Sequence, residues 1–232
     1  MQARDRLIVA LDVSSRDDVL RLVDELRGAV GMFKIGLQAF IANGPAIVRD
    51  VVSRGERVFL DLKIHDIPNT AMRAVAEAGR LGVSLLTVHA TGGAAMLRAA
   101  AAARVAGLEL LGVTVLTSLD DDELTRAGFR GTAMELALRL AALSREAGID
   151  GVVASPLEIA AIRETFGGSL RIVTPGIRPA GSAAGDQRRT MTPADAIAAG
   201  ADMIVVGRPI TGAESRRDAA LRITDEIAAA LQ

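Results

Sequence analysis

Asp61, Lys63 and Asp66 are the side chains of this sequence best placed to do chemistry together. They follow the apolar segment 58–60 and belong to the run Asp-Leu-Lys-Ile-His-Asp. Side chains alternate faces along a β-strand, so Asp61 and Lys63 point the same way, while Asp66 lies beyond the strand in the turn toward the next helix. The spacing predicts that two carboxylates and an ammonium converge on one small volume. A solvated loop with an incidental ion pair is the alternative, and the rest of the chain decides between the two.

Short apolar, branched segments alternate with longer amphipathic segments from end to end. Eight of them are predicted strands, at 7–12, 32–36, 58–63, 85–89, 110–116, 151–154, 171–174 and 203–207. The predicted helices lie at 16–27, 38–54, 69–81, 93–106, 132–147, 156–166, 193–199 and 213–231. The first helix shows the apolar face clearly, with Val19, Leu22, Val23 and Leu26 on one side. Six helices are expected to end at a left-handed glycine, namely Gly28, Gly55, Gly82, Gly107, Gly148 and Gly200.

This alternation predicts an α/β fold in which helices cover a parallel sheet. Eight such units in 232 residues fit a single-domain (β/α)8 TIM barrel over residues 1–232, at the small end of a range that begins at roughly 200 residues. A doubly wound open sheet is the alternative. It is disfavoured because the sequence has no Gly-x-Gly-x-x-Gly after the first strand and no phosphate-loop lysine motif.

In a barrel, the C-terminal ends of the strands share one mouth, and the active site lies there. The first predicted strand ends at Asp12, the second contains Lys34, and the third ends at Asp61 and Lys63. Buried charges must alternate in sign, because an unpaired one costs several kcal/mol. Lys34 therefore needs a carboxylate partner, which Asp61 or Asp12 can supply. With Asp66, the mouth is predicted to hold two lysines and three aspartates.

The last two strands predict an anion subsite. Gly207 allows backbone amides to approach a ligand, and Arg208 supplies a forked cation. The position after strands seven and eight is the usual phosphate site of this fold. The segment 175–187 is rich in glycine and alanine and holds Arg178 and Gln187. We expect this segment to be a mobile loop that can close over an anion, with an ordinary flexible connection as the alternative.

The composition argues against several classes of function. The 27 basic and 28 acidic residues leave a formal net charge of -1, so no bulk attraction to nucleic acid or an acidic membrane is expected. Aromatic residues make up 2%, which leaves few stacking platforms for single-stranded nucleic acid. Cysteine is absent, which excludes thiolate catalysis and Cys-based zinc sites, and no His/Asp/Glu grouping has metal-site spacing. With no signal-peptide pattern and no long apolar span, a cytoplasmic protein is expected.

These motifs, in this order, resemble the orotidine 5'-monophosphate decarboxylase family over essentially the whole chain. The most specific part is the ten-residue block 61–70, which reads Asp-Leu-Lys-Ile-His-Asp-Ile-Pro-Asn-Thr. The combination of this block with Lys34 is more specific than the block alone. The other matching segments are Leu-Asp at 11–12, Phe-Lys-Ile-Gly at 33–36, Val-Leu-Thr-Ser at 115–118, Thr-Pro-Gly-Ile-Arg at 174–178, Asp-Gln at 186–187 and Val-Gly-Arg-Pro-Ile-Thr at 206–211. The resemblance implies decarboxylation of orotidine 5'-phosphate to UMP, the last step of pyrimidine nucleotide synthesis, without metal or organic cofactor.

The resemblance also implies a role for each charged residue. Loss of CO2 leaves an sp2 carbanion at C6 that the ring stabilises poorly, so the reaction needs preorganised charge and a proton donor. Lys63 is expected to be that donor. Asp61 is expected beside the substrate carboxylate, either raising its energy or orienting Lys63. Lys34 is expected to hold Asp61 and contact the ribose, and Asp12 to contact a ribose hydroxyl.

Further positions follow from the same resemblance. It implies a homodimer in which Asp66, Ile67 and Thr70 reach into the partner's site. The remaining substrate contacts that it implies are Arg208, Gly207, Gln187 and Arg178 at the phosphate, Thr117 and Ser118 at the pyrimidine, and Pro175.

Three other functions are kept as alternatives. The related Mg2+-dependent 3-keto-6-phosphogulonate decarboxylases and hexulose-phosphate synthases share the fold and the Asp-x-Lys-x-x-Asp motif, but carry a glutamate where this chain has Lys34. A lysine there would repel the metal. A non-catalytic nucleotide-binding barrel would have no use for Lys63. A sugar-phosphate isomerase would need a Glu or Cys base at a strand end, and none is evident.

Overall fold

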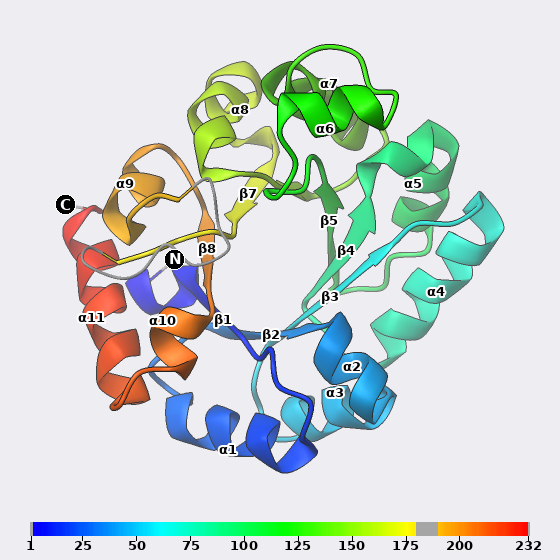
Figure 1. The fold of residues 1–232 in the computed structure, drawn as a ribbon. Helices are drawn as coiled ribbons and strands as arrows, with labels where there is room; N and C mark the ends of the chain where they lie inside the picture. The colour runs from blue at the N-terminus through cyan, green and yellow to red at the C-terminus, as the bar shows by residue number, and fades with distance from the viewer. Residues whose placement is uncertain (1, 180–189, 232) are drawn as a thin grey trace.

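The computed structural model describes residues 2–179 and 190–231, and eight parallel strands form its centre (Figure 1). The strands are β1 (Leu7–Ala10), β2 (Met32–Gly36), β3 (Val58–Ile64), β4 (Leu85–His89), β5 (Glu109–Val113), β6 (Gly151–Val153), β7 (Arg171–Thr174) and β8 (Met203–Val206). Each strand pairs with the next along the chain, and β1 pairs with β8. The sheet is therefore closed, which confirms the predicted (β/α)8 barrel and rules out the open sheet.

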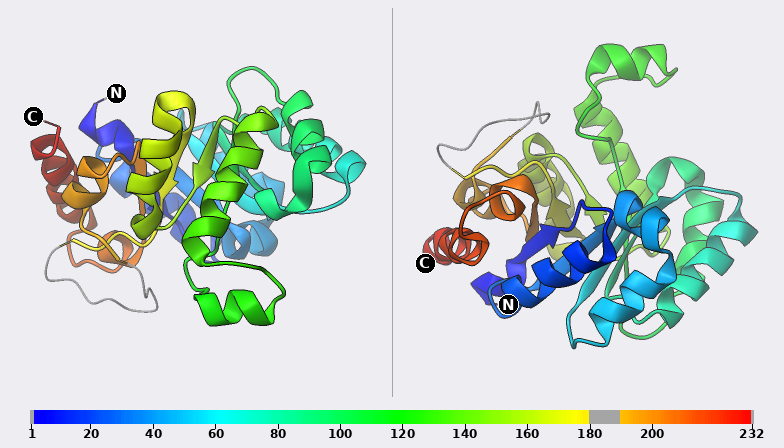
Figure 2. Two further views of the ribbon diagram at one scale, coloured as in Figure 1. Left: turned by 90° about the horizontal axis from the view of Figure 1, so that it is seen from above. Right: turned by 60° about the horizontal axis from the view of Figure 1, so that its bottom comes forward.

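A ring of helices surrounds the barrel (Figure 1). The helices are α1 (Arg16–Leu26), α2 (Leu37–Asn43), α3 (Pro45–Val52), α4 (Pro68–Arg80), α5 (Gly93–Ala102), α6 (Asp121–Arg126), α7 (Ala133–Glu146), α8 (Ile159–Phe166), α9 (Pro193–Ala198), α10 (Arg208–Thr211) and α11 (Arg216–Ala229), with 3-10 turns η1 (Ala3–Arg6), η2 (Ala90–Gly92), η3 (Pro156–Glu158) and η4 (Gly167–Ser169). Figure 2 shows α6 standing off this ring. Within the described ranges, no helix combines the length and apolar character needed to cross a membrane.

Several predicted boundaries are wrong. The single helix expected at 38–54 is two helices, because Gly44 ends α2 with a φ of 64° and Pro45 starts α3. Proline has no N–H to donate and fits the first turn of a new helix. The helix expected at 156–166 begins as a 3-10 turn, and α6 and α10 were not predicted. The first, fifth, sixth and eighth strands end earlier than expected, so that Asp12 and Gly207 lie just beyond strands and not within them.

Two layers of apolar side chains hold the fold together. The barrel interior is filled by Ile8, Ala10, Met32, Phe59, Leu85, Leu111, Val173, Met203 and Val205, all buried. Neighbouring residues on the same strands, such as Leu7 and Val9 on β1, belong to a larger cluster that packs against the helices. The barrel is therefore a packed core with no pore, and a ligand can enter only beyond the inner layer, at one end of the strands.

Candidate active site

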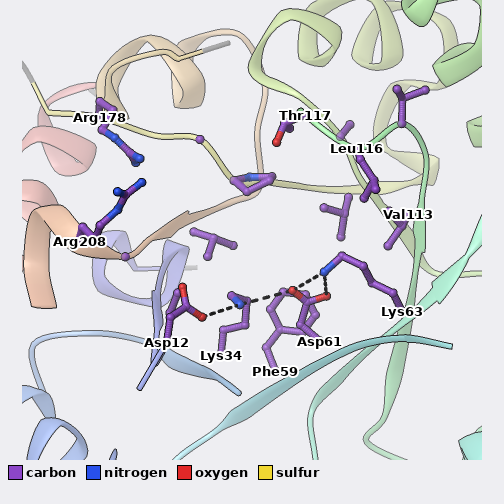
Figure 3. A pocket seen from close by; sticks show the side chains of 18 residues that line it. Asp12, Lys34, Phe59, Asp61, Lys63, Val113, Leu116, Thr117, Arg178 and Arg208 are labelled. Carbon is purple, nitrogen blue, oxygen red and sulfur yellow. Dashed lines mark hydrogen bonds and ion pairs between the residues drawn. The ribbon is translucent and has the colours of Figure 1, made fainter. Parts of the chain in front are cut away.

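A cavity of about 510 Å³ lies at the C-terminal ends of the strands (Figure 3). Its apolar floor is formed by Ala10, Phe59, Val153 and Val205, which also belong to or pack against the inner core. The other lining residues are Asp12, Lys34, Asp61, Lys63, Val113, Val115, Leu116, Thr117, Ala154, Pro175, Gly176, Arg178, Gly207 and Arg208. Its volume suits a small organic molecule, and its position is that of an active site in this fold.

Four charged residues of alternating sign cross the cavity in one row (Figure 3). Lys34 Nζ lies 3.5 Å from Asp12 Oδ1 and 3.4 Å from Asp61 Oδ2. Lys63 Nζ donates to both carboxylate oxygens of Asp61, at 2.9 and 3.0 Å. The expected carboxylate partners of Lys34 are therefore confirmed, as is the shared face of Asp61 and Lys63. Gly36 leaves room for this row, because a Cβ there would lie 3.0 Å from Lys34 Nζ.

Asp61 is the most enclosed carboxylate of the row, with its side chain 12% exposed. Burial by itself raises the pKa of Asp61, but the ammonium of Lys34, then that of Lys63, and hydrogen bonds from Lys63 and Thr87 outweigh it and hold this pKa below its usual value. Asp61 is therefore a carboxylate at neutral pH. Asp12, by contrast, is 60% exposed and faces the open side of the row.

The end of β3 has an unusual local geometry. Its register with β4 runs from Leu60 opposite Leu86 to Ile64 opposite Val88, so three residues of β3 face a single residue of β4, Thr87. Lys63 lies in this interruption with a φ of 51°, the one positive φ among the non-glycine residues that the structure describes. Such a conformation in a non-glycine residue persists only where its surroundings hold it, and it is concentrated at functional sites.

Two arginine side chains lie on the side of the cavity where the row begins at Asp12. Figure 3 shows the side chains of Arg178 and Arg208 pointing toward one another at this side of the cavity. Gly207 lies next to them, and its position would bring a Cβ within 3.9 Å of Asp12 Oδ2. The described lining residues include four cations and two carboxylates, a surplus of two positive charges. The cavity therefore favours an anionic ligand.

Some predicted site residues do not line this cavity. Asp66 and Thr70 are exposed, Ile67 is 66% exposed, and Asp66 Oδ1 accepts a hydrogen bond from the N–H of Ile67 at 2.7 Å. The predicted convergence of Asp66 with Asp61 and Lys63 is therefore not found within one chain. Ser118 is exposed and lies outside the lining, next to Thr117, which is part of it. Gln187 lies outside the described residues.

The two histidines pack on one another beside the site. Their rings stack with centroids 5.3 Å apart, and His89 Nδ1 lies 2.7 Å from Thr91 Oγ1. Burial lowers the pKa of His89, and His65 and Lys63 lower it further. His89 is therefore neutral at physiological pH and is held by hydrogen bonding. Over residues 2–179 and 190–231, no group of three His, Asp or Glu side chains is arranged to hold a metal ion.

The sequence did not single out Thr87, which contacts Asp61 and the backbone of Lys63. Nor did it assign a role to the apolar wall of Val115, Leu116 and Ala154, which lines the cavity. The signal for Thr87 was its place two residues before His89, as a polar residue inside the apolar segment Leu-Leu-Thr-Val. Ala154 directly follows β6, and Val115 and Leu116 lie shortly after the end of β5. Apolar side chains at such positions cannot be told from core residues in the sequence.

Comparison with known proteins gives consistent matches over the whole chain. Residues 5–223 match the family model for the orotidine 5'-phosphate decarboxylase / HUMPS family. A protein of Moorella thermoacetica named orotidine 5'-phosphate decarboxylase is 54% identical over 236 residues, covering 98% of this chain and 94% of the relative. One of the same name from Methylobacterium sp. (strain 4-46) is 52% identical over 231 residues, covering 98% and 97%.

Solved structures agree with this match. The crystal structure of orotidine 5'-phosphate decarboxylase from Lactobacillus acidophilus has a TM-score of 0.85 at 36% identity and covers 95% of this chain and 98% of its own. The enzyme of the same name from Pyrococcus horikoshii OT3 has a TM-score of 0.79 at 27% identity, with the same coverage of 95% and 98%.

Proposed function

This chain belongs to the orotidine 5'-phosphate decarboxylase / HUMPS family, and on that premise we propose that Lys63 supplies the proton in its reaction. That reaction is the decarboxylation of orotidine 5'-phosphate to UMP, a carbon–carbon lyase step of pyrimidine biosynthesis. The family description also covers a second group of enzymes, but the relatives that are about half identical over the full length carry the decarboxylase name. Lys34 in β2 supports the same choice, because a cation there opposes a divalent metal. A cytoplasmic location is part of the proposal.

The fixed contact between Lys63 and Asp61 is the observation that carries the proposal. Departure of CO2 leaves an electron pair at C6 of the pyrimidine, and a proton must reach that carbon. An ammonium has three N–H groups, and the two carboxylate oxygens of Asp61 accept at 2.9 and 3.0 Å. One N–H of Lys63 can therefore face C6 while the other two hold the nitrogen in place. Such preorganisation stabilises the developing charge without rearrangement during the reaction.

Asp61 is proposed to orient Lys63. Its lowered pKa keeps it ionised beside the substrate carboxylate, so a like-charge effect on the ground state accompanies the orientation. Lys34 Nζ lies 3.4 Å from Asp61 Oδ2 and balances its charge. Lys34 is also proposed to contact the ribose. Asp12, which is more than half exposed, has a carboxylate open to a ribose hydroxyl.

The phosphate of the substrate is proposed to bind between Arg178 and Arg208, next to the backbone of Gly207, with Gln187 as a further contact. Two guanidinium groups provide forked donors that match phosphate oxygens. The pyrimidine is proposed to contact Thr117, Ser118 and Pro175. Binding energy at the phosphate can then stabilise the catalytic arrangement and affect turnover as well as affinity.

A homodimer with a shared site is a further part of the proposal. Asp66, Ile67 and Thr70 lie outside the cavity of their own chain and are exposed, as residues that serve a partner's cavity would be. Large apolar side chains are also exposed on α4, where Met72 is 36% exposed, and on α2, where Leu37 is 49% and Ile41 is 78% exposed. Exposed apolar side chains of this kind support a protein contact.

Subunit mixing tests the shared site. In a two-fold dimer, a Lys63→Ala chain paired with an Asp66→Ala chain has one doubly damaged site and one intact site. Random mixing should therefore restore about a quarter of the wild-type activity per site, because half of the dimers are mixed. No recovery on mixing, with dimers present in sedimentation equilibrium, would place Asp66 in its own chain's site or outside catalysis.

The ultraviolet absorbance of orotidine 5'-phosphate, followed with purified protein in EDTA, tests the reaction and the role of Lys63. The wild type should give the UMP spectrum, and Lys63→Ala should lose at least about 10³-fold in turnover while UMP affinity stays within roughly tenfold. Lys63→Arg is the matched control, because it retains the positive charge but does not release a proton near neutral pH. Turnover by Lys63→Arg close to the wild type would refute Lys63 as the acid. No conversion of orotidine 5'-phosphate by the folded wild type would instead favour the metal-dependent relatives, whose sugar-phosphate reactions would then be tested with Mg2+ restored.

A further inference from the structure

Thr87 replaces the strand pairing that β3 loses at the active site. Between the pairs Leu60–Leu86 and Ile64–Val88, β3 has two residues more than β4, so regular backbone pairing is not possible there. The N–H of Lys63 donates instead to Thr87 Oγ1 at 2.8 Å. The same hydroxyl donates to Asp61 Oδ1 at 3.0 Å. One side chain on β4 thus joins the backbone of Lys63 to the carboxylate of Asp61.

This double role requires a hydroxyl group. A hydroxyl donates one hydrogen bond and accepts others, whereas a methyl group of the same size does neither. Thr87 is completely buried, so water does not reach these atoms to replace it. Without the hydroxyl, the N–H of Lys63 and one bond to Asp61 would be unsatisfied in an enclosed place, which is costly.

The conformation of Lys63 depends on the same contact. Its φ of 51° is one that a lysine rarely adopts, and the hydrogen bond from its N–H holds it there. That conformation allows the side chain of Lys63 to return over Asp61, two residues earlier, and to contact both of its oxygens. A change in the backbone at Lys63 would therefore move the ammonium.

We propose that Thr87 is a positioning residue of the decarboxylation reaction, which fixes both members of the Asp61–Lys63 pair through its single hydroxyl. The inference rests on the proposed function of that pair. Thr87 does not line the cavity, so we expect it to act through Asp61 and Lys63 without contacting the substrate. Its effect should therefore fall on the rate of the chemical step and leave ligand binding almost unchanged.

Thr87→Val and Thr87→Ser, compared under the absorbance assay, test the proposal. Valine has the shape of threonine without the hydroxyl, and serine keeps the hydroxyl without the methyl. We expect Thr87→Val to lower kcat about ten- to a hundredfold, with KM and UMP affinity within about threefold of the wild type. Thr87→Ser should recover most of the lost turnover.

Thr114→Val is the matched control. Thr114 is 1% exposed and its Oγ1 donates to the carbonyl of Val153 at 3.0 Å, so this variant also removes a buried, hydrogen-bonded hydroxyl, but one that does not touch Asp61 or Lys63. Its stability should fall as much as that of Thr87→Val, with kcat nearly unchanged.

The outcomes separate the two proposals. If the wild type does not convert orotidine 5'-phosphate, the proposed function fails. If the wild type is active, three results overturn the role of Thr87: kcat of Thr87→Val within threefold of the wild type, an equal loss of kcat in Thr114→Val, or no recovery in Thr87→Ser.

Discussion

Replacing Lys34 by methionine should destabilise the protein by leaving Asp61 short of one cation. Lys34 is 13% exposed and lies 3.4 Å from Asp61 Oδ2 and 3.5 Å from Asp12 Oδ1. At an effective dielectric constant of about 20, the attraction to Asp61 is roughly 5 kcal/mol before the cost of removing both charges from water. The contact with Asp12 adds about 0–1 kcal/mol, because that carboxylate is exposed and screened.

The net loss should be about 2–3 kcal/mol. Breaking a buried pair by removing one partner costs about 3–5 kcal/mol, and Asp61 retains the contacts of Lys63, which reduce this loss. For a chain of this length, that corresponds to a fall in melting temperature of roughly 5–10 °C. Methionine is a suitable replacement because it is unbranched and fills the same space without a charge.

Thermal and urea unfolding of Lys34→Met, Asp61→Asn and the double variant measure the effect. The double variant no longer contains an underpaired carboxylate, so it should be more stable than the sum of the two single changes predicts, by at least about 1 kcal/mol. A midpoint for Lys34→Met at or above that of the wild type, or strict additivity in the double variant, would refute the argument that the row is held together by alternating charge.

Three further results are expected. The pKa of Asp61 is lowered in the folded protein, so its ionisation contributes stability above the unfolded pKa of roughly 4. That contribution is lost as pH falls through the lower folded pKa, and the stability difference between wild type and Asp61→Asn should shrink over this acid range in urea titrations. Asp202→Ala should lose about 1–3 kcal/mol of stability at unchanged kcat. Asp202 Oδ2 accepts hydrogen bonds from Arg163 at 2.7 Å and from the N–H of Ile172 at 2.8 Å. Both contacts lie at the start of β7, away from the cavity. Equal losses of stability and turnover would contradict this separation. Arg208→Ala should lower kcat/KM for orotidine 5'-phosphate about ten- to a hundredfold and affect the phosphate-free nucleoside much less, whereas equal losses on both substrates would remove Arg208 from the phosphate site.

The periodicity of the sequence was sufficient to predict the barrel. Strands that are buried on both faces appear as short apolar runs, and helices with a single buried face appear as amphipathic segments, so both could be read from the sequence. The short helix α6 was not predicted because, of its six residues, only Leu124 is buried, which leaves no periodic signal. The break at Gly44 and Pro45 did have a local signal, which the long apolar pattern of 38–54 obscured.

The part of the site that depends on the alternation of side chains along one strand could be predicted from the sequence. Asp61 and Lys63 share a face because they are two residues apart, and their contact follows from that spacing. The role of Thr87 depends on the register between β3 and β4, which includes an interruption that neither strand shows in its own sequence. Residues whose position is set by pairing between strands are thus the ones that sequence reasoning misses.

The use of lysine supports the assignment of chemistry to the row. Of the 27 lysine and arginine residues in the chain, only Lys34 and Lys63 are lysines, and both line the cavity. Arginine is an effective cation for surface pairs and for phosphate, but its guanidinium does not release a proton near neutral pH, whereas an ammonium in a suitable environment does. A stretch of alternating charge that served stability alone could use arginine as the rest of the molecule does. A compact ammonium is present at the two positions next to Asp61, and at Lys63 the backbone adopts a rare conformation. Both observations support the proposal that Lys63 donates a proton in addition to supplying positive charge.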